Sequence, residues 1–427
     1  MVLKIQLFSY IFFTVLFFSN FSLSSQIFDY ETELFLNKLI IDIKSVNKFN
    51  KNIKIYIIKD DNPNAFVISE NKLIVSSGLL EQSPDYVSLL AVLAHEIGHL
   101  EYFHLEKRKE TLQKFSKLNL ISNLALISGS ILAQDPQVLG GAVASQVNIN
   151  NFYLSFSREQ EREADLYSIK TLQKLNLPSE SVKELLKILE KNALDKGFDE
   201  NYQKFSTHPI FKERYEIIDY NSKNKILNFN KDTQDEFNFI KAKFMAYNDT
   251  LNLTNLNDDH KTYYDSISSS ESGNLVISLK KLNFLIKKFP INTFFLETKG
   301  DILRSHGYLN ESVKFYKLVL NKYPDNYYIK YKIFLDTNMK NMQLNSKINF
   351  FYENINLIIQ FPKNKYIINK FIEIAKDLEK IYWLDFFNTI SDINSKNMEE
   401  LPKKLNNLSK ETNETKLKKI INEYNNL

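Results

Sequence analysis

The sequence predicts a mainly α-helical protein with a small β-sheet near its N-terminus, an α+β arrangement in which helices dominate. Three observations support this fold class. Apolar residues recur at three- and four-residue intervals over much of the chain, short runs typical of strands cluster between Ile53 and Val75, and part of the second half carries a helical pattern with a 34-residue period.

Length and composition narrow the class of protein. The 427 residues are enough for two or three domains with a substantial core. The 55 basic and 51 acidic residues nearly cancel, which gives no reason to expect a nucleic-acid partner. The chain has no cysteine, so disulfides, thiolate ligands and cysteine nucleophiles are excluded, and a metal site would have to use histidine and carboxylate side chains.

The first residues resemble a secretory signal. Lys4 precedes the apolar run from Leu7 to Phe18, and a small-residue stretch at Ser22 to Ser25 follows. This pattern predicts a signal peptide over residues 1–24, cleaved after Ser24, and therefore an exported protein. An uncleaved membrane anchor is the alternative, because residues 5–21 are almost long enough to span a bilayer.

Several elements follow in order along residues 27–194. The spacing of apolar residues predicts helices over 27–50, 86–103, 157–175 and 179–194, and alternation predicts strands at 53–58, 65–68 and 72–75, closed by Gly78. Residues 117–150 hold two apolar patches, each too short to cross a bilayer. They fit a buried helical hairpin, or alternatively a mobile lid or a surface that contacts membrane or unfolded polypeptide.

The second half contains a repeat. Gly273 and Gly307 are 34 residues apart, as are Pro290 and Pro324, with small and apolar residues at matching places between them. This period is that of tetratricopeptide helix–turn–helix repeats. We therefore expect a metallopeptidase domain over residues 25–222, for the reasons that follow, and a helical, tetratricopeptide-like domain over residues 223–427.

The motif that carries chemistry is His95-Glu96-Ile97-Gly98-His99, an HExxH sequence preceded by an apolar stretch. Two histidines four residues apart share a helix face, so both rings can reach one ion. Glu96 lies beside them, where it can act as general base toward a water molecule at the metal. The pattern predicts one zinc ion per subunit.

A catalytic zinc site needs a third protein ligand and an open position. The charged segment Ser157 to Asp165 offers three glutamates, Glu159, Glu161 and Glu163. Glu161 shares a helix face with Asp165, which could hydrogen-bond to His95 or His99 and orient it without binding the metal. Glu159 and Glu163 share a face as well, so spacing alone leaves the choice of ligand open. A solvated, charged helix is the alternative for this cluster.

The chain resembles a known family at these residues. HExxH followed by Ser157-Arg158-x-x-Glu161-x-x-Ala164-Asp165 is similar to the HtpX and CAAX-prenyl-protease family of zinc metallopeptidases, over roughly residues 50–220. The export signal and the trailing repeats narrow the resemblance to its BepA-like periplasmic members. The resemblance implies a gluzincin-like helical domain, Glu161 as third ligand and Asp165 as its companion.

The resemblance also extends to a histidine further along the chain. His208-Pro209 with Arg214 resembles a family segment whose histidine can approach the metal, so His208 is a candidate ligand and gate; a structural histidine near the cleft is the alternative. His104 follows His99 by five residues and is expected to point elsewhere on the helix. Asp165 or Arg214 could assist the oxyanion or the leaving group.

Together these features predict a periplasmic zinc endopeptidase. The resemblance implies quality control of outer-membrane proteins, with unfolded or misassembled polypeptides as substrates, outer-membrane assembly machinery as a partner and peripheral membrane contact. A chaperone or scaffold that acts through the repeats, with a latent zinc site, is the alternative from another class. A purely structural zinc site, with four protein ligands, is a third.

Overall fold

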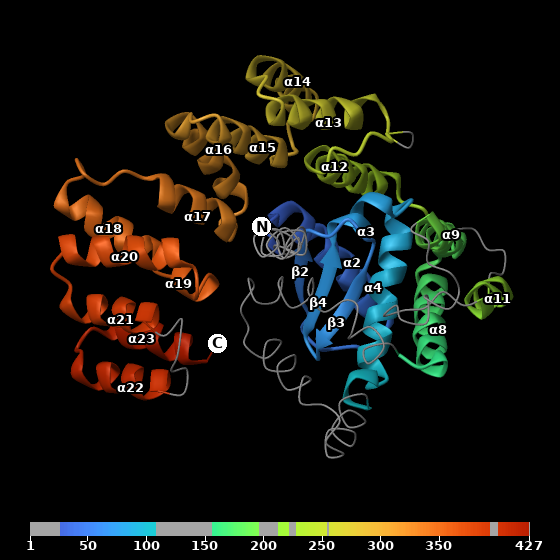
Figure 1. The fold of residues 1–427 in the computed structure, drawn as a ribbon, viewed down its shortest axis with the longest axis horizontal. Coiled ribbons are helices and arrows are strands. Elements are labelled where there is room, and N and C mark those ends of the chain that lie inside the picture. The colour runs from blue at the N-terminus through green and yellow to red at the C-terminus, as the bar shows by residue number, and fades with distance from the viewer. Residues whose placement is uncertain are drawn as a thin grey trace, which may run out of the picture. The chain divides into compact units, whose positions relative to one another are not determined.

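The computed structural model describes residues 26–107, 156–195, 212–221, 228–253, 256–392 and 400–426. The predicted signal peptide, the apolar segment 117–150 and His208 lie outside these residues. Helices dominate and one small four-stranded sheet is present among the described residues, which confirms the predicted fold class (Figure 1). The chain divides between Glu271 and Ser272 into two compact units.

The first unit contains the sheet and the helices that surround it. Its strands are β1 (Gln26–Ile27), β2 (Lys54–Ile58), β3 (Ala65–Ser69) and β4 (Lys72–Ser76). Its helices are α2 (Tyr30–Val46), α3 (Ser77–Gln82), α4 (Tyr86–Glu101), α8 (Arg158–Leu175), α9 (Glu180–Asp195), α11 (Lys212–Asn221), α12 (Lys231–Tyr247) and α13 (Asp258–Glu271). The strands at 53–58, 65–68 and 72–75 were predicted nearly in place, whereas β1 and α3 were not predicted.

The sheet has the strand order β1-β2-β4-β3, so β3 forms one edge. β2 and β4 pair in parallel, and β3 returns antiparallel to β4. Gly78 follows the last strand at a point of close approach: its backbone N–H donates to the Asp60 carbonyl at 2.8 Å, and a Cβ there would lie 2.3 Å from the Asp61 carbonyl oxygen. Glycine is therefore required where the chain leaves the sheet.

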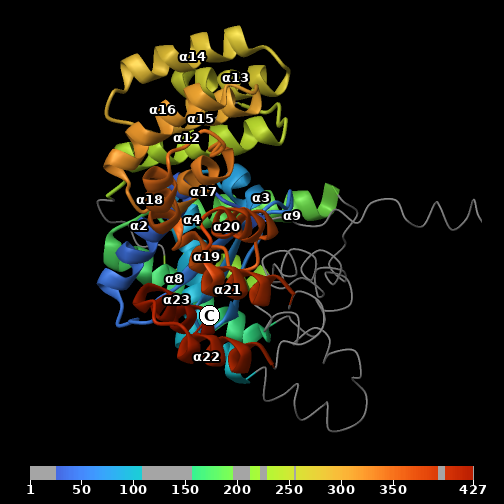
Figure 2. The ribbon, with the colours of Figure 1, turned by 90° about the vertical axis from the view of Figure 1, so that its left-hand side faces the viewer.

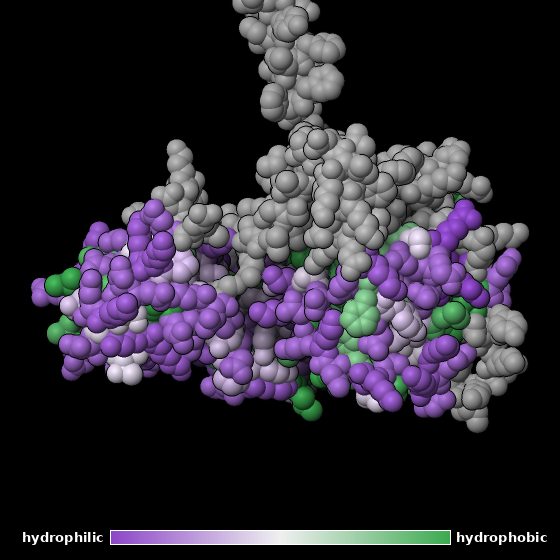
Figure 3. Space-filling view, turned by 90° about the horizontal axis from the view of Figure 1, so that it is seen from below, coloured by the Kyte–Doolittle hydropathy of each residue, from purple (hydrophilic) through white to green (hydrophobic). Residues whose placement is uncertain are grey.

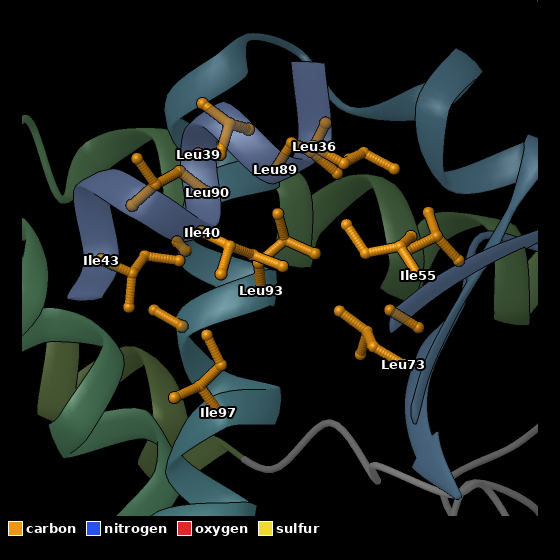
Figure 4. Packing of buried hydrophobic residues seen from close by; sticks show 14 of the residues in the cluster. Leu36, Leu39, Ile40, Ile43, Ile55, Leu73, Leu89, Leu90, Leu93 and Ile97 are labelled. Carbon is orange, nitrogen blue, oxygen red and sulfur yellow. The ribbon is translucent and has the colours of Figure 1, made fainter. Parts of the chain in front are cut away.

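The main core lies between the sheet and two helices. In Figure 4 the side chains Leu39 and Ile43 of α2 face Leu93 and Ile97 of α4, with Leu73 of β4 beside them. All five are fully buried. Burial of this kind stabilises each such side chain by about 1.5–3 kcal/mol relative to exposure. The helix with the HExxH motif is thus held rigidly by its apolar residues.

The first unit continues beyond residue 222, where a domain boundary was expected. Helix α12 contributes Phe237, Ile240 and Phe244 to the same core, because its apolar face packs on α2, α3 and α4. A buried ion cluster adds to this contact: Lys243 Nζ lies 2.6 Å from Asp29 Oδ2 and 2.7 Å from Glu31 Oε2. Burial raises the pKa of Glu31, whereas at Asp29 burial is outweighed by the charge and hydrogen bond of Lys243 together with the hydrogen bonds of Thr32, and that pKa is lowered.

Replacing Lys243 with methionine is expected to destabilise the fold by about 3–5 kcal/mol at pH 7.5, because two buried carboxylates lose their counter-charge. Without Lys243, burial raises both carboxyl pKa values in the folded state, so the folded protein binds more protons than the unfolded one above pH ~4. Stability of the variant then falls as pH rises, and its deficit against wild type widens from pH 4.5 to pH 7.5. Urea unfolding at the two pH values measures this.

The matched control for this prediction is Lys231→Met on the exposed first turn of the same helix. A surface change there should shift stability by about 0.5 kcal/mol or less. An equal deficit of Lys243→Met at both pH values would contradict the buried-charge explanation.

The second unit is helical throughout its described residues. Its helices are α14 (Leu275–Lys288), α15 (Phe294–Ser305), α16 (Leu309–Lys322), α17 (Tyr327–Asp336), α18 (Leu344–Asn354), α19 (Leu357–Gln360), α20 (Lys365–Asp377), α21 (Ile381–Asp392), α22 (Leu401–Glu411) and α23 (Thr415–Asn425). Gly273, with a φ of +79°, lies between α13 and α14, and Gly307, with a φ of +84°, lies between α15 and α16. The two turns are 34 residues apart. The left-handed conformation explains glycine at both turns.

Close packing within this unit centres on aromatic side chains. Helices α15 and α16 lie side by side (Figure 2), and a Cβ on Gly300 would lie 2.5 Å from the ring of Tyr316. The Tyr316 hydroxyl donates to Asp301 at 2.6 Å. Further along, Trp383 and Phe351 are fully buried in an edge-to-face contact with ring centroids 5.2 Å apart. The unit has its own apolar core.

On the face drawn in Figure 3, the coloured residues are mainly hydrophilic, with apolar residues in separate spots. Among the described residues, no helix combines the length and the apolar character needed to cross a bilayer.

Candidate metal centre

Helix α4 presents both histidines of the motif on one face. The helix begins at a capping box, in which the Asp85 carboxylate accepts from the Ser88 backbone N–H and the Ser88 hydroxyl oxygen accepts from the Asp85 backbone N–H. Near the C-terminal end of this helix, the Nε2 atoms of His95 and His99 lie 3.1 Å apart, and both side chains are buried. Their lone pairs can therefore meet at one point.

A glutamate from a second helix completes the group. Glu161 Oε2 lies 3.4 Å from His95 Nε2, and Glu161 Oε1 lies 3.6 Å from His99 Nε2. Helices α4 and α8 approach closely because Gly98 has no side chain: a Cβ there would lie 3.1 Å from Tyr167 Cβ. The Ser168 hydroxyl also donates to the Ala91 carbonyl at 2.7 Å. The helix crossing thus fixes the distance between carboxylate and imidazoles.

These atoms fit a zinc ion. Ligand atoms about 2.1 Å from a tetrahedral zinc lie about 3.4 Å from one another. The two Nε2 atoms are 3.1 Å apart, and the Glu161 carboxylate places Oε2 3.4 Å from His95 Nε2 and Oε1 3.6 Å from His99 Nε2. Candidate ligand atoms of His95, Glu96 and His99 also lie within 4.8 Å of one another. Two imidazoles and one carboxylate match the donor set of catalytic zinc sites.

Asp165 holds the far side of the His95 ring. Its Oδ1 lies 2.9 Å from His95 Nδ1. Arg214 donates two hydrogen bonds to the same carboxylate, from Nε to Oδ2 at 2.8 Å and from Nη2 to Oδ1 at 2.7 Å. Burial opposes the charge on His95, but the hydrogen bonds and charges of Asp165 and Glu161 outweigh it and raise the His95 pKa. Burial is likewise outweighed at Asp165, whose pKa is lowered by Arg214. Arg214 is thus engaged with Asp165.

The three glutamates on α8, between which spacing could not choose, have different surroundings. Glu161 meets both histidines, whereas Glu159 is exposed and lies 3.6 Å from Arg162. Glu163 Oε2 lies 2.8 Å from His104 Nε2. Glu161 is therefore the glutamate that the fold places at the candidate ligand position.

The expectation for His104 was wrong. Helix α4 ends at Glu101, and Phe103 adopts a left-handed φ of +57°, so the chain reverses before His104. His104 Nδ1 consequently lies 2.9 Å from His99 Nδ1. On a helix that continued through Phe103, a residue five positions past His99 would point away from it, but the helix ends at Glu101. The contact between His104 and His99 could have been predicted only by recognising that the helix ends just after the HExxH motif.

Glu96 connects the candidate metal site to the sheet. Its Oε2 accepts a hydrogen bond from the Val67 backbone N–H at 3.1 Å. Val67 lies on β3, the edge strand, and the Asn64 carbonyl accepts from the Ser76 N–H at 2.9 Å. Because backbone groups alternate along a strand, those of Ala65 and Val67 point away from β4. Glu96 therefore lies at the side of β3 that does not pair with β4.

By fold and geometry, this arrangement defines a metal-dependent peptidase centre: two histidines one turn apart, a glutamate between them and a second glutamate from another helix. Residues 35–222 match the model of peptidase family M48.

Proteins whose names describe them as proteases are similar to parts of this chain. The beta-barrel assembly-enhancing protease of Escherichia coli K12 is 24% identical over 289 residues, which cover 64% of this chain and 58% of that protein. The protein of the same name in Yersinia pestis is 28% identical over 36% of this chain and 31% of its own length. The mitochondrial metalloendopeptidase OMA1 of Schizosaccharomyces pombe is 24% identical over 44% of this chain and 52% of its own. The aligned segments cover between 31% and 58% of these relatives' own lengths.

Proposed function

We propose that this chain is a zinc-dependent endopeptidase of the periplasm that cleaves unfolded or misassembled outer-membrane proteins. The observation that carries the proposal is the convergence of His95, His99 and Glu161 with Glu96 beside them. The names of the relatives in Escherichia coli and Yersinia pestis, which refer to β-barrel assembly, support the substrate class.

The proposed organisation follows the sequence analysis. Residues 1–24 serve as the cleaved export signal and residues 25–222 as the metallopeptidase domain, whose compact unit also takes in the described helices up to Glu271. The rest of residues 223–427 serves as a tetratricopeptide-like domain that holds substrate or assembly machinery. The two glycine turns 34 residues apart, at Gly273 and Gly307, support a repeat in that domain. Contact with membrane is peripheral, and nucleic acid is not a partner.

The proposed chemistry assigns one task to each side chain. His95, His99 and Glu161 would hold zinc, which supplies a Lewis acid that acidifies water and polarises the scissile carbonyl. Glu96 accepts a proton from the attacking water and returns it to the departing amine. Asp165, fixed by Arg214, keeps the His95 proton on Nδ1 and leaves Nε2 free to coordinate.

The edge strand offers a place for the substrate. An extended polypeptide can add to a free strand edge through its backbone, without regard to side-chain identity. Such binding suits unfolded proteins of varied sequence. Because Val67 on β3 contacts Glu96, a polypeptide bound along β3 would lie next to the proposed base.

The experiment that tests the proposal is removal of zinc from the full exported chain. The purified protein should contain one zinc ion and cleave an unfolded outer-membrane protein; a chelator should abolish cleavage and added zinc should restore it, as followed by gel electrophoresis. A chain that holds zinc and binds the substrate without cleaving it would instead favour the scaffold alternative. In the same assay, faster cleavage by His208→Ala would support the proposed gate, and unchanged or slower cleavage would speak against it.

A further inference from the structure

The side chain of His104 lies between a candidate ligand and a carboxylate. His104 Nδ1 is 2.9 Å from His99 Nδ1, and His104 Nε2 is 2.8 Å from Glu163 Oε2. His104 itself is fully buried, whereas the Glu163 side chain is 41% exposed. Both ring nitrogens of His104 thus make a hydrogen bond, Nδ1 with the candidate ligand His99 and Nε2 with the Glu163 carboxylate.

The contacts fix the position of each proton. His99 directs Nε2 toward His95 and Glu161, so coordination there requires its single proton to be on Nδ1. Two nitrogens 2.9 Å apart need one donor and one acceptor, so His104 Nδ1 accepts that proton. The His104 proton is then on Nε2, from which it is donated to Glu163. One arrangement satisfies every contact.

The backbone is bent to make these contacts. Phe103 holds a φ of +57°, which costs a bulky residue roughly 1–2 kcal/mol relative to an ordinary helical conformation. Local strain that persists in a folded protein is characteristic of positions where it serves a site. Here it turns His104 back toward the His99 ring. Simple burial of an imidazole would not require two aligned hydrogen bonds.

We propose that His104 and Glu163 are positioning residues for the metal ligand His99, acting as an imidazole–carboxylate relay that presents His99 Nε2 to the ion. The inference rests on the proposed function, since it concerns the same metal. The two histidine ligands are then supported differently: His95 directly by the buried Asp165, and His99 through an intervening imidazole by the half-exposed Glu163. The candidate ligand Glu161 and the two supporting carboxylates, Asp165 and Glu163, all come from one helix, α8.

The test compares two substitutions at His104 in the full chain. His104→Phe fills the space but cannot accept the His99 proton, whereas His104→Asn places an oxygen at the position of Nδ1 and still accepts it. Loss of such a supporting partner lowers metal affinity by about 10–100-fold. We expect that loss for His104→Phe, with an affinity for His104→Asn closer to that of wild type. Zinc dissociation constants are measured by competition with a chromophoric chelator.

A spectroscopic measurement separates positioning from general stability. Cobalt absorption bands report the ligand geometry, so His104→Phe should change them and His104→Asn should largely preserve them. Circular dichroism of the metal-free variants verifies that each is folded. If His104→Phe does not fold, Glu163→Gln on the half-exposed end of the relay replaces it, with Glu159→Gln on the same helix as the matched control. Glu163→Gln should weaken zinc binding and Glu159→Gln should not.

The outcomes distinguish this inference from the proposed function. Equal zinc affinity of His104→Phe and wild type, equal losses in His104→Phe and His104→Asn, or equal affinities in the two glutamine variants would each overturn the relay. A wild-type chain that binds zinc and cleaves substrate would leave the proposed function standing in those cases. A wild-type chain that binds no zinc would remove the proposed function itself.

Discussion

Replacing Glu96 with glutamine is expected to lower kcat/KM for peptide cleavage by about 10²–10⁴-fold while leaving the zinc content unchanged, since this is the usual contribution of a positioned general base. Glutamine keeps the size of the side chain and an oxygen that can accept the Val67 N–H, so the link to the edge strand at 3.1 Å survives. The basic carboxylate alone is lost. Cleavage of a quenched fluorescent peptide and metal analysis on the same sample measure the two quantities.

The comparison with wild type also decides between enzyme and scaffold. Because Glu96 is buried beside His95 and His99, the substitution is judged together with the thermal stability of both proteins. Equal rates of cleavage in Glu96→Gln and wild type, with both folded, would remove the enzymatic interpretation of the motif.

The second large effect is expected for Glu161→Ala. This change removes one of three converging ligand atoms and also a negative charge that faces both imidazoles at 3.4 and 3.6 Å. The remaining site holds two neutral rings near the Arg214 guanidinium, whose Nη1 lies 4.0 Å from the Glu161 carboxylate. Zinc affinity should therefore fall by more than the roughly 10–100-fold typical of losing a supporting partner. Equilibrium dialysis against zinc measures the change.

Glu159→Ala is the matched control for this prediction, because Glu159 lies on the same helix but is exposed and paired with Arg162. Its zinc affinity should equal that of wild type. Retention of zinc by Glu161→Ala at wild-type affinity would show that the third ligand lies elsewhere in the chain.

Local patterns predicted much of the secondary structure. The helix with the HExxH motif, the strands β2, β3 and β4 and helix α8 all follow from local sequence patterns, since each is decided by residues within a few positions of one another. The resemblance to a zinc metallopeptidase family, stated from the motif and the Ser157 to Asp165 segment, is confirmed by the family match over residues 35–222. The mainly helical fold class is confirmed as well.

Long-range contacts could not be predicted in the same way. The strand order β1-β2-β4-β3 depends on parallel pairing between strands that are not neighbours in sequence. Helix α12 joins the first unit through Phe237 and Lys243, which contact residues about two hundred positions earlier. No local pattern encodes such partners, because the free energy of the contact depends on both segments being already folded.

By itself the sequence determined the residue types and the spacing that place His95 and His99 one turn apart with Glu96 between them, because helical periodicity is a local property. Tertiary structure decided which of Glu159, Glu161 and Glu163 meets those histidines, and it brought His104 back to His99 through the left-handed turn at Phe103. The physical reason is that side chains on a helix acquire partners only where a second element crosses, and Gly98 sets how closely α8 can approach.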